Sequence, residues 1–251
     1  MAKHPDLLYL KSIMRPTPAE LCASGVKVVR ALQEQGEFVV TFPRAYHAGF
    51  SHGCNIGEAV NFATSHWLSF GRLAIERYRS ITPVVKKSVI QHEQLLFELA
   101  GSTAAGPTVL THVRAELRLL RAEYAVLIKD LEDSGTKTTA VAPESEFSDF
   151  VGVQCEVCNH SCHIGAVLLE TGEATKRFCC MQHCKQIEHD AAKSQGLLWK
   201  NLDDMDEYAS RIDLFFARGG ATEDKDGRRC SVCMRGGNLL GPFSVEQFYG
   251  E

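Results

Sequence analysis

Hydrophobic and polar positions along the chain predict a β element first and helices after it. Two runs rich in β-branched and aromatic residues flank a Glu-Gln-Gly turn in residues 26–42, which is the pattern of a hairpin. A glycine-rich stretch follows, and then a short apolar run over 59–63 that is typical of a further strand. Apolar residues then recur at helical spacing from Trp67 to Tyr78. We therefore expect strands closed by a helix.

Two longer amphipathic helices are predicted in the middle of the chain. Apolar residues recur with a period of about 3.6 over residues 84–100 and again over 108–133, and a segment containing Gly and Pro separates the two runs. The segment 134–149 is polar with one proline and is typical of a linker. Residues 190–220 are expected to be helical.

These patterns divide the chain into consecutive parts and predict a mixed α+β fold class. The parts are a β element over 1–80, a helical region over 81–133, a linker over 134–150, a segment rich in Cys and His over 151–190, and a helical segment with a C-terminal Cys-x2-Cys tail over 191–251. A domain boundary near residue 150 follows from this division.

Composition and charge exclude several classes of protein. The 251 residues are 45% hydrophobic and 23% charged, which is ordinary for a globular protein and argues against disorder throughout. No stretch approaches about 18 uninterrupted apolar residues, and the N-terminus lacks the pattern of a secretory signal, so we expect no membrane association. The net charge of −4 argues against a broad nucleic-acid footprint, because affinity for phosphates comes mainly from clustered Lys and Arg.

Cysteine is the most informative part of the composition. Eight of the ten cysteines lie beyond residue 150, and clustered thiols in a chain without a secretory signal indicate metal more than disulfides. A Cys-x2-Cys pair is followed by a Cys-x2-His pair, and donors at this spacing on tight turns can reach one tetrahedral Zn²⁺. The four predicted zinc ligands are Cys155, Cys158, Cys180 and His183. Cys22 and Cys54 have no partner spacing and are expected to be buried small hydrophobic residues.

A second zinc site is less clearly defined by the sequence. The remaining donors of this segment are Cys162, Cys179, Cys184, His160, His163 and His189, among which no second pair of clean spacings exists. Cys230 and Cys233 form another Cys-x2-Cys, but the 18 residues after them contain no Cys or His. They either complete a second site with Cys162 and with Cys184 or His189, or open a further finger, or are surface thiols. The candidate second set is Cys162, Cys184, His189, Cys230 and Cys233.

The run GEFVVTFPRAYHAGFSHGCNIGEAVNFATSHWLSFGR, which contains His47, resembles nearly residue by residue the last strands of the JmjC domain of histone lysine demethylases. It resembles in particular the subgroup that follows this domain with a helical region and a zinc finger of five Cys, one His and two Cys. The resemblance begins at HPDLLYLKSIMRPTP and continues through the predicted helices to Cys155. It implies that residues 1–80 are C-terminal strands of a double-stranded β-helix, a cupin-like jelly roll.

The resemblance also implies an iron ligand. In that family two histidines and one carboxylate hold Fe(II), and 2-oxoglutarate fills two further positions. His47 matches the third ligand, while the other two form a His-x-Asp or His-x-Glu pair several strands earlier. His4 and Asp6 have this spacing, but HPDLL aligns with a later segment, so we expect a chance match. The basic residue that anchors 2-oxoglutarate is likewise expected upstream of residue 1.

The resemblance extends to a substrate pocket and partly to a second zinc site. Positions matching those that line the methyl-lysine pocket of related enzymes are Ala59, Val60 and Asn61, although inward-facing strand residues are the simpler interpretation of the first two. Cys162 matches one ligand of the family's second zinc. Leu169 and Thr171 stand where the family has a close cysteine pair, and the late cysteine pair after His183 is missing.

Together these features predict part of an Fe(II)- and 2-oxoglutarate-dependent histone lysine demethylase that acts in the nucleus on the histone H3 tail. Zn²⁺ is the expected cofactor, and Fe²⁺ with 2-oxoglutarate is expected only where an N-terminal part supplies the other ligands. The chain alone is expected to be inactive. The expected partners are the histone tail and subunits of a chromatin complex. The alternative is a non-catalytic zinc-binding module for chromatin binding or complex assembly, against which the unpaired strand edges of an incomplete β-helix argue.

Overall fold

The computed structural model describes residues 17–80, 88–172 and 175–220. Described residues up to Asn61 belong to one compact unit, and those from Phe62 onward belong to another.

Among the described residues of the first unit, a short helix forms, α2 (Pro18–Ala23). Thr17 caps this helix by accepting a hydrogen bond from the Glu20 backbone, and the Glu20 side chain accepts one from Thr17 in return. No strand forms in residues 24–61, so the hairpin predicted over 26–42 is wrong for this structure. A strand needs a neighbouring strand to pair its backbone groups, and no described residue supplies one here.

Side chains of the first unit are largely exposed as a result. Phe38 is 71% exposed and Ile56 fully exposed, although both are large and apolar. The prediction that Cys22 and Cys54 are buried is wrong, because both thiols are exposed. The residues around them pack into no core that would cover a small apolar side chain.

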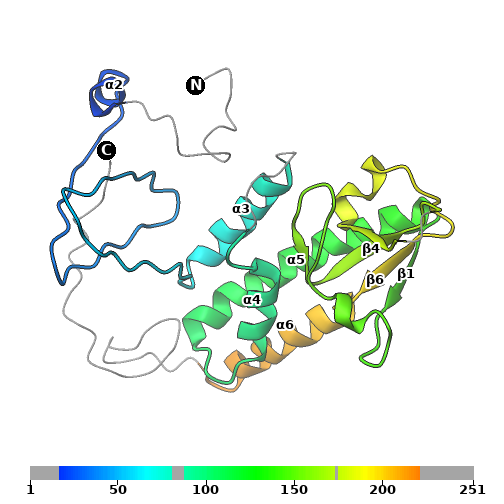
Figure 1. Ribbon diagram of the computed structural model, residues 1–251. Coiled ribbons are helices and arrows are strands. Elements are labelled where there is room, and N and C mark those ends of the chain that lie inside the picture. The colour runs from blue at the N-terminus through cyan, green and yellow to red at the C-terminus, as the bar shows by residue number, and fades with distance from the viewer. Residues whose placement is uncertain (1–16, 81–87, 173–174, 221–251) are drawn as a thin grey trace. The chain divides into compact units, whose positions relative to one another are not determined.

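Three helices of the second unit follow the predicted apolar periodicity, and a fourth lies within residues 190–220, which were expected to be helical. They are α3 (Trp67–Ser80), α4 (His92–Gly101), α5 (Pro107–Asp133) and α6 (Leu202–Ala217). α5 begins with Pro107, whose fixed φ suits the first turn of a helix, and the chain leaves it at Gly135, where φ is +95°. Figure 1 shows α5 as the longest helix, with α3, α4 and α6 packed along it. No helix in the described part of the chain is long and apolar enough to cross a membrane.

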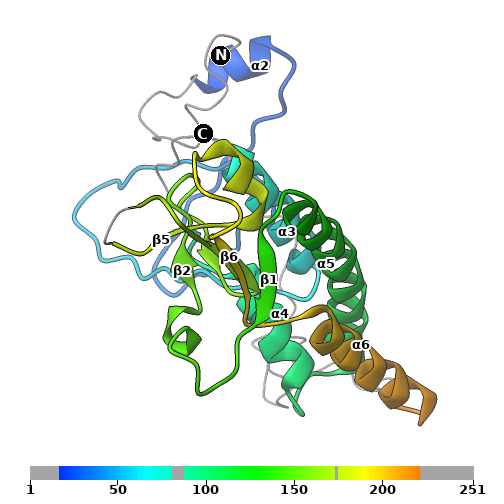
Figure 2. The same ribbon diagram turned by 90° about the vertical axis from the view of Figure 1, so that its right-hand side faces the viewer.

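Four strands of the second unit build one sheet beside the C-terminal part of α5 (Figure 2). In order across the sheet they are β1 (Lys137–Ala140), β6 (Gln195–Leu198), β4 (Gly165–Leu169) and β5 (Arg177–Cys179). β1 and β6 are parallel, and the other two pairings are antiparallel. β2 (Val153–Gln154) and β3 (Ser161–Cys162) form a separate antiparallel pair. Two 3₁₀ helices, η1 (Ser148–Phe150) and η2 (Met181–Gln186), complete the unit.

None of the strands in the described residues was predicted from the sequence, and two of them replace another expected element. β1 lies in the predicted linker, and β6 lies in the segment predicted to be helical. The two strands pair with each other in register from Lys137 with Gln195 to Ala140 with Leu198. Each strand thus pairs its backbone with residues 58 positions away in the chain. The local sequence pattern does not reveal such distant pairing.

A continuous apolar core joins the helices to the sheet and to the cysteine-rich segment. Its fully buried members include Leu96 and Val113 on helices, Ile164 before β4 and Leu197 on β6. Backbones approach closely in this core, because a Cβ on Gly165 would lie 2.8 Å from the Leu197 carbonyl oxygen. The mixed α+β class is confirmed. The predicted boundary near residue 150 stays a prediction, and the structure places both sides of it against this core.

Candidate metal centre

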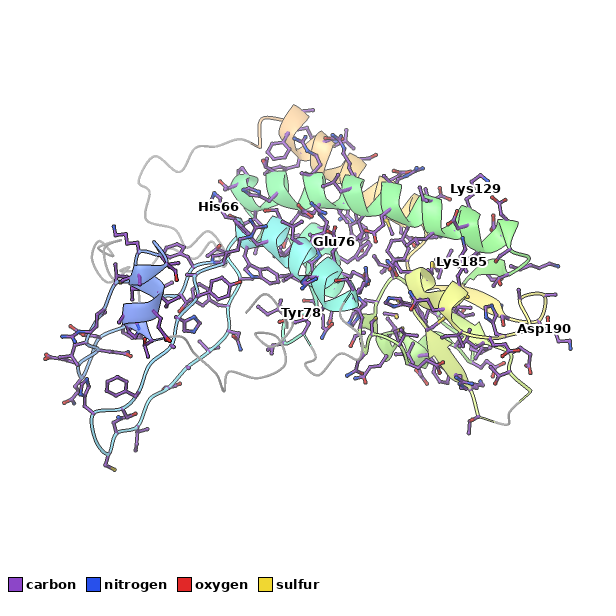
Figure 3. All side chains as sticks on the ribbon, turned by 90° about the horizontal axis from the view of Figure 1, so that it is seen from above. His66, Glu76, Tyr78, Lys129, Lys185 and Asp190 are labelled. Atoms are coloured by element: carbon purple, nitrogen blue, oxygen red, sulfur yellow. The ribbon has the colours of Figure 1, made fainter. Side chains whose placement is uncertain are left out.

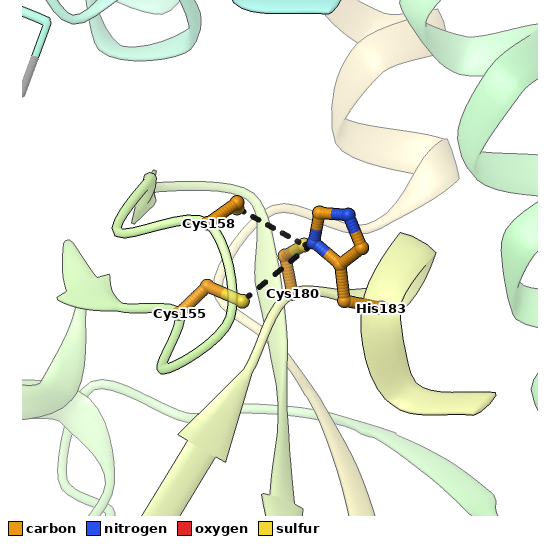
Figure 4. Close-up of side chains that lie close together, drawn as sticks. All are labelled: Cys155, Cys158, Cys180 and His183. Carbon is orange, nitrogen blue, oxygen red and sulfur yellow. Dashed lines mark hydrogen bonds between the residues drawn. The ribbon is translucent and has the colours of Figure 1, made fainter. Parts of the chain in front are cut away.

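Cys155 and Cys158 lie on a tight turn between β2 and β3. The Cys155 N–H donates to the His160 carbonyl at 2.9 Å, and the Asn159 N–H donates to the Cys155 carbonyl at 2.8 Å. Asn159 has φ 57°, a left-handed conformation that Asn adopts more readily than most residues. This turn brings both thiols toward Cys180 and His183, as Figure 4 shows.

Cys180 and His183 come from the end of β5 and the start of η2. Cys180 is the residue before η2, and its carbonyl accepts the His183 N–H at 3.0 Å. One turn of 3₁₀ helix has about three residues, so side chains at this spacing project from the same face. The two-residue gap in the sequence therefore becomes a pair of donors on one side of the chain.

The four side chains form one compact, buried group of metal donors. Their ligand atoms all lie within 4.8 Å of one another. The His183 Nδ1 is 3.2 Å from the Cys180 Sγ and 3.8 Å from the Cys155 Sγ, and the Cys158 and Cys180 sulfurs are 3.9 Å apart (Figure 4). Zinc bonds of about 2.3 Å to sulfur and about 2.0 Å to nitrogen place tetrahedral donors roughly 3.5–3.8 Å apart. The group therefore fits Zn²⁺.

The protonation of the three thiols also favours a cation. Hydrogen bonds from Cys158 and Cys180 lower the pKa of Cys155 far below its usual range. The hydrogen bond to Cys155 raises the pKa of Cys158, and hydrogen bonds to Cys155 and Cys158 raise that of Cys180. One thiolate thus forms at the expense of its neighbours, because buried negative charges repel one another. A divalent cation among the sulfurs removes this repulsion and allows further ionisation.

A buried carboxylate ties this turn to the helices. Glu93 of α4 is 2% exposed and accepts hydrogen bonds from the Arg79 guanidinium at 2.7 Å and the Tyr124 hydroxyl at 3.1 Å. Its other oxygen accepts the His163 backbone N–H at 3.3 Å, and the His160 ring nitrogen lies 3.5 Å from the first oxygen. The Glu93 carboxylate therefore connects α3, α4 and α5 to the segment that carries His160 and His163.

Charges around Glu93 keep it ionised despite its burial. Burial alone would raise the pKa of Glu93, but the nearby His160 ring and the charge of Arg79 outweigh it and hold that pKa well below its usual range. Burial likewise opposes the charged form of Arg79, and the Glu93 charge raises the pKa of Arg79 in compensation. This ion pair was not predicted from the sequence, where its only signal is a charged residue among the apolar positions of each helix.

Members of the candidate second zinc set are only partly brought together. Cys184 and His189 are neighbours, with Sγ and Nε2 3.4 Å apart. Cys162 does not join them, because its thiol lies against the His160 carbonyl at 3.8 Å. Cys230 and Cys233 lie outside the described residues.

His47 is placed on an exposed loop of the first unit. Its Nδ1 lies 3.2 Å from the Ala45 carbonyl oxygen. Among the described residues, His47 belongs to no group of three or more metal donors. His4 and Asp6 lie outside the described residues. The described residues therefore do not form an Fe(II) site. The pocket candidates are also exposed rather than gathered around a cavity: Ala59, Val60 and Asn61.

Known proteins resemble this chain over most of its length. The family described as "JmjC domain, hydroxylase" matches residues 1–62. The lysine-specific demethylase JMJ17 of Arabidopsis thaliana is 34% identical over 216 residues, which cover 84% of this chain and 17% of that protein. The chain is related to the JmjC lysine-specific demethylases. Lysine-specific demethylase 5D of Homo sapiens is 33% identical over 212 residues, 80% of this chain and 13% of that protein.

Another lysine-specific demethylase also matches this chain. Lysine-specific demethylase 5B of Gallus gallus is 36% identical over 165 residues, which cover 65% of this chain and 10% of that protein. The resemblance stated from the sequence is therefore confirmed. The chain spans about a sixth of the length of JMJ17 and less of the other two. A JmjC domain implies a cupin-like jelly roll for residues 1–62, whose described part forms no strands in the absence of pairing partners.

Proposed function

We propose that this chain is part of an Fe(II)- and 2-oxoglutarate-dependent histone lysine demethylase that acts in the nucleus on the histone H3 tail. The observation that carries the proposal is the similarity to lysine-specific demethylases over 84% of the chain, far beyond the 62 residues of the JmjC match. Within the proposed protein, the partners are the histone tail and the subunits of a chromatin complex. The chain contributes strands of the JmjC domain, a helical region and a zinc finger.

The proposed zinc is structural. Cys155, Cys158, Cys180 and His183 offer four protein ligands, which leave no open position for water or substrate. A Zn²⁺ held by them would fix the turn between β2 and β3 to the start of η2. The Glu93 contacts to His160 and His163 then join that fixed turn to α3, α4 and α5. We propose that the finger braces the helices.

The proposed role of His47 is to hold iron within a complete JmjC domain. Iron supplies the oxidising power for demethylation when it is bound with 2-oxoglutarate. The described residues place no second donor beside His47, so no catalytic step follows from them. Ala59, Val60 and Asn61 are proposed to line the methyl-lysine pocket in the same complete domain. The 251-residue chain by itself is proposed to be inactive.

The activity of the chain itself is tested with a trimethyl-lysine histone H3 peptide. The purified chain is supplied with Fe(II), 2-oxoglutarate and the peptide, and released formaldehyde is measured. We expect no release above the level without enzyme. Turnover that depends on both Fe(II) and 2-oxoglutarate would show that this chain assembles an iron site, in contradiction to the proposal.

The role of His47 is tested in the longer protein. Transcripts are read upstream of Met1 for an in-frame His-x-Asp or His-x-Glu, and the protein they encode is assayed for formaldehyde release. His47→Ala is expected to abolish activity, and His52→Ala, a histidine exposed on the same loop, serves as the matched control. Equal activities of the two variants would remove His47 from the proposed iron site.

One observation favours the alternative of a non-catalytic module. The helices and the four-donor group share one core in the second unit, and none of residues 17–61, the described part of the first unit up to Asn61, belongs to that core. Such a unit could serve as a binding surface for chromatin or a complex without iron. A transcript with a stop codon directly upstream of Met1 and no His-x-Asp or His-x-Glu would favour the module over the demethylase.

A further inference from the structure

Two phenylalanine rings and a carboxylate surround a lysine ammonium beside β5. The Lys176 Nζ lies 4.8 Å from the centre of the Phe147 ring and 5.1 Å from the centre of the Phe150 ring. The Glu146 carboxylate lies 3.2 Å from the same nitrogen. The face of an aromatic ring carries negative charge density, which attracts cations within about 6 Å of the ring centre. A lysine of this chain therefore occupies a cation site that two rings and an acid form.

The 3₁₀ helix η1 places the two rings side by side. Phe147 directly precedes η1, and Phe150 is its last residue. A 3₁₀ helix has three residues per turn, so side chains three positions apart project to the same side. The ring centres are 6.4 Å apart, and the ring planes are inclined by 48°. The two inclined rings therefore form adjoining walls of one cation site.

Contacts with the sheet hold both rings independently of the lysine. The Trp199 indole N–H donates to the Phe147 carbonyl oxygen at 2.9 Å. The buried Phe178 ring of β5 packs on the Phe150 ring, with the ring centres 5.1 Å apart. Phe147 and Phe150 are themselves only partly buried. Displacement of Lys176 would therefore expose a ring pair that keeps its geometry.

Lys176 itself is held weakly in this site. Its side chain is 44% exposed, and the side chain of its partner Glu146 is 71% exposed. Exposed ion pairs contribute little, because water and salt screen them and both side chains lose conformational freedom. The ammonium of an ordinary lysine is also strongly hydrated, which opposes its transfer onto an aromatic face. A cation that leaves water more readily can therefore displace Lys176.

Methylation turns a lysine ammonium into such a cation. Three methyl groups remove the N–H donors and spread the positive charge over a larger surface, and aromatic rings recognise quaternary ammonium groups of this kind. A lysine side chain already reaches the rings in this structure, so the site accepts the lysine stem as well as the charge.

We propose that Phe147, Phe150 and Glu146 bind a trimethyl-lysine side chain of another polypeptide, and that Lys176 occupies the site in its absence. The Glu146 carboxylate balances the charge of either occupant. The proposal goes beyond the demethylase function, because binding at this site needs no iron. Its test contains neither Fe(II) nor 2-oxoglutarate, so its failure is distinct from a failure of the proposed enzyme activity.

Titration of the zinc-loaded 251-residue chain with a short peptide of Ala and Gly around one trimethyl-lysine tests the proposal. The chain has two tryptophans, and the NMR signal of the Trp199 indole N–H reports on the site through its hydrogen bond to Phe147. The trimethylated peptide is expected to shift this signal saturably. The unmethylated peptide is expected to bind about 2-fold to 30-fold more weakly. Equal affinities of the two peptides, or no shift with either, would overturn the proposal.

Choline separates a site for lysine side chains from a site for free quaternary ammonium compounds. Choline carries the same trimethylammonium group without the lysine stem, so it is expected to bind more weakly than the trimethylated peptide. Binding of choline as tight as that of the peptide would assign the site to free quaternary ammonium compounds and would also overturn the proposal.

Variants separate the site from a general effect on folding. Phe150→Leu keeps an apolar side chain but removes one aromatic face, so binding of the trimethylated peptide should weaken by about 2-fold to 30-fold at unchanged zinc content. Lys176→Ala removes the internal competitor and is expected to tighten binding. Lys193→Ala is the matched control and should leave binding unchanged, because Lys193 forms a similar exposed ion pair, at 3.1 Å with Asp190, which Figure 3 labels. Unchanged binding in Phe150→Leu, or binding in Lys176→Ala no tighter than in wild type, would contradict the proposal.

Discussion

The two regions that carry candidate metal ligands differ in how the chain holds them. In the first unit His47 stands on an exposed loop, its ring nitrogen near the Ala45 carbonyl two residues away. In the second unit Cys155, Cys158 and their two partner donors sit on short hydrogen-bonded turns and are buried to within 6% exposure. Local turns are sufficient to build the zinc group, whereas an iron site of the JmjC type needs strands far apart in the chain.

This difference explains why one site is formed by nearby residues and the other is not. A Cys-x2-Cys or Cys-x2-His turn fixes two donors within one loop, so four ligands require only two loops to meet. A jelly-roll strand depends on paired neighbours for both its backbone and its position. His47 is therefore a ligand only in the context of other strands, and the cysteine cluster is a site in its own right.

The largest effect is expected from Cys155→Ser. Removing one thiolate from a four-ligand zinc site forfeits much of a binding free energy of about 10–16 kcal/mol, which acts as folding free energy. Zinc content should fall, and the thermal unfolding transition of the second unit should move to a much lower temperature or lose cooperativity. Circular dichroism and zinc analysis measure both. Cys54→Ser is the control, and equal melting temperatures would refute the structural role of zinc.

The next largest effect is expected from Glu93→Gln, which breaks the buried ion pair with Arg79. Leaving one charge of such a pair unpaired in the interior costs about 3–5 kcal/mol. Glu76→Gln is the matched control, because Glu76 pairs with Arg72 on the same helix and is 48% exposed, so its loss should cost less than about 1 kcal/mol. Urea unfolding of zinc-loaded protein measures the difference. Equal free energies of unfolding for both variants would contradict the assigned role of Glu93.

A smaller, pH-dependent effect follows from the same carboxylate. The pKa of Glu93 is held below its value in the unfolded chain, about 4.3, because His160 and Arg79 outweigh the effect of burial. Its charge therefore contributes stability that is fully present above about pH 4.3 and is lost as the pH falls through the lower folded pKa. The difference in unfolding free energy between wild type and Glu93→Gln should be constant near neutral pH and shrink in acid. A difference that grows in acid would contradict the lowered pKa of Glu93.

The smallest effect is expected in the first unit. His47→Ala changes an exposed side chain, so the free energy of unfolding should change by less than about 0.5 kcal/mol and zinc content should not change. Thiol alkylation adds an independent comparison. Cys22 and Cys54 should react rapidly in the zinc-loaded chain, and the six buried cysteines of the described second unit should be protected. Protection of Cys22 and Cys54 would show a packed first unit.

The features that could be predicted from the sequence are those that depend on residues close together in the chain. The period of apolar residues placed α3 and α5 nearly to their ends, and the Cys-x2-Cys and Cys-x2-His spacings identified all four members of the compact donor group. Resemblance of the run around His47 identified the JmjC family. These features lie within single helices, single turns or one continuous segment.

What the sequence did not reveal depends on partners distant in the chain. β1 has the polar sequence KTTA and forms a strand only because β6 pairs with it. The hairpin predicted over 26–42 has strand-forming residues but no described partner, and stays without strands. The contact of Arg79 with Glu93 and the approach of His189 to Cys184 likewise arise from folding, not from spacing.

Metal analysis of the purified chain tests the central claim most directly. The chain is incubated with Zn²⁺, Fe(II) and 2-oxoglutarate under anaerobic conditions and desalted, and both metals are measured by mass spectrometry. We predict that zinc remains bound, that Cys155→Ser loses zinc, and that iron is absent from wild type and His47→Ala alike. Stoichiometric iron that disappears in His47→Ala, or zinc content unchanged in Cys155→Ser, would contradict the account.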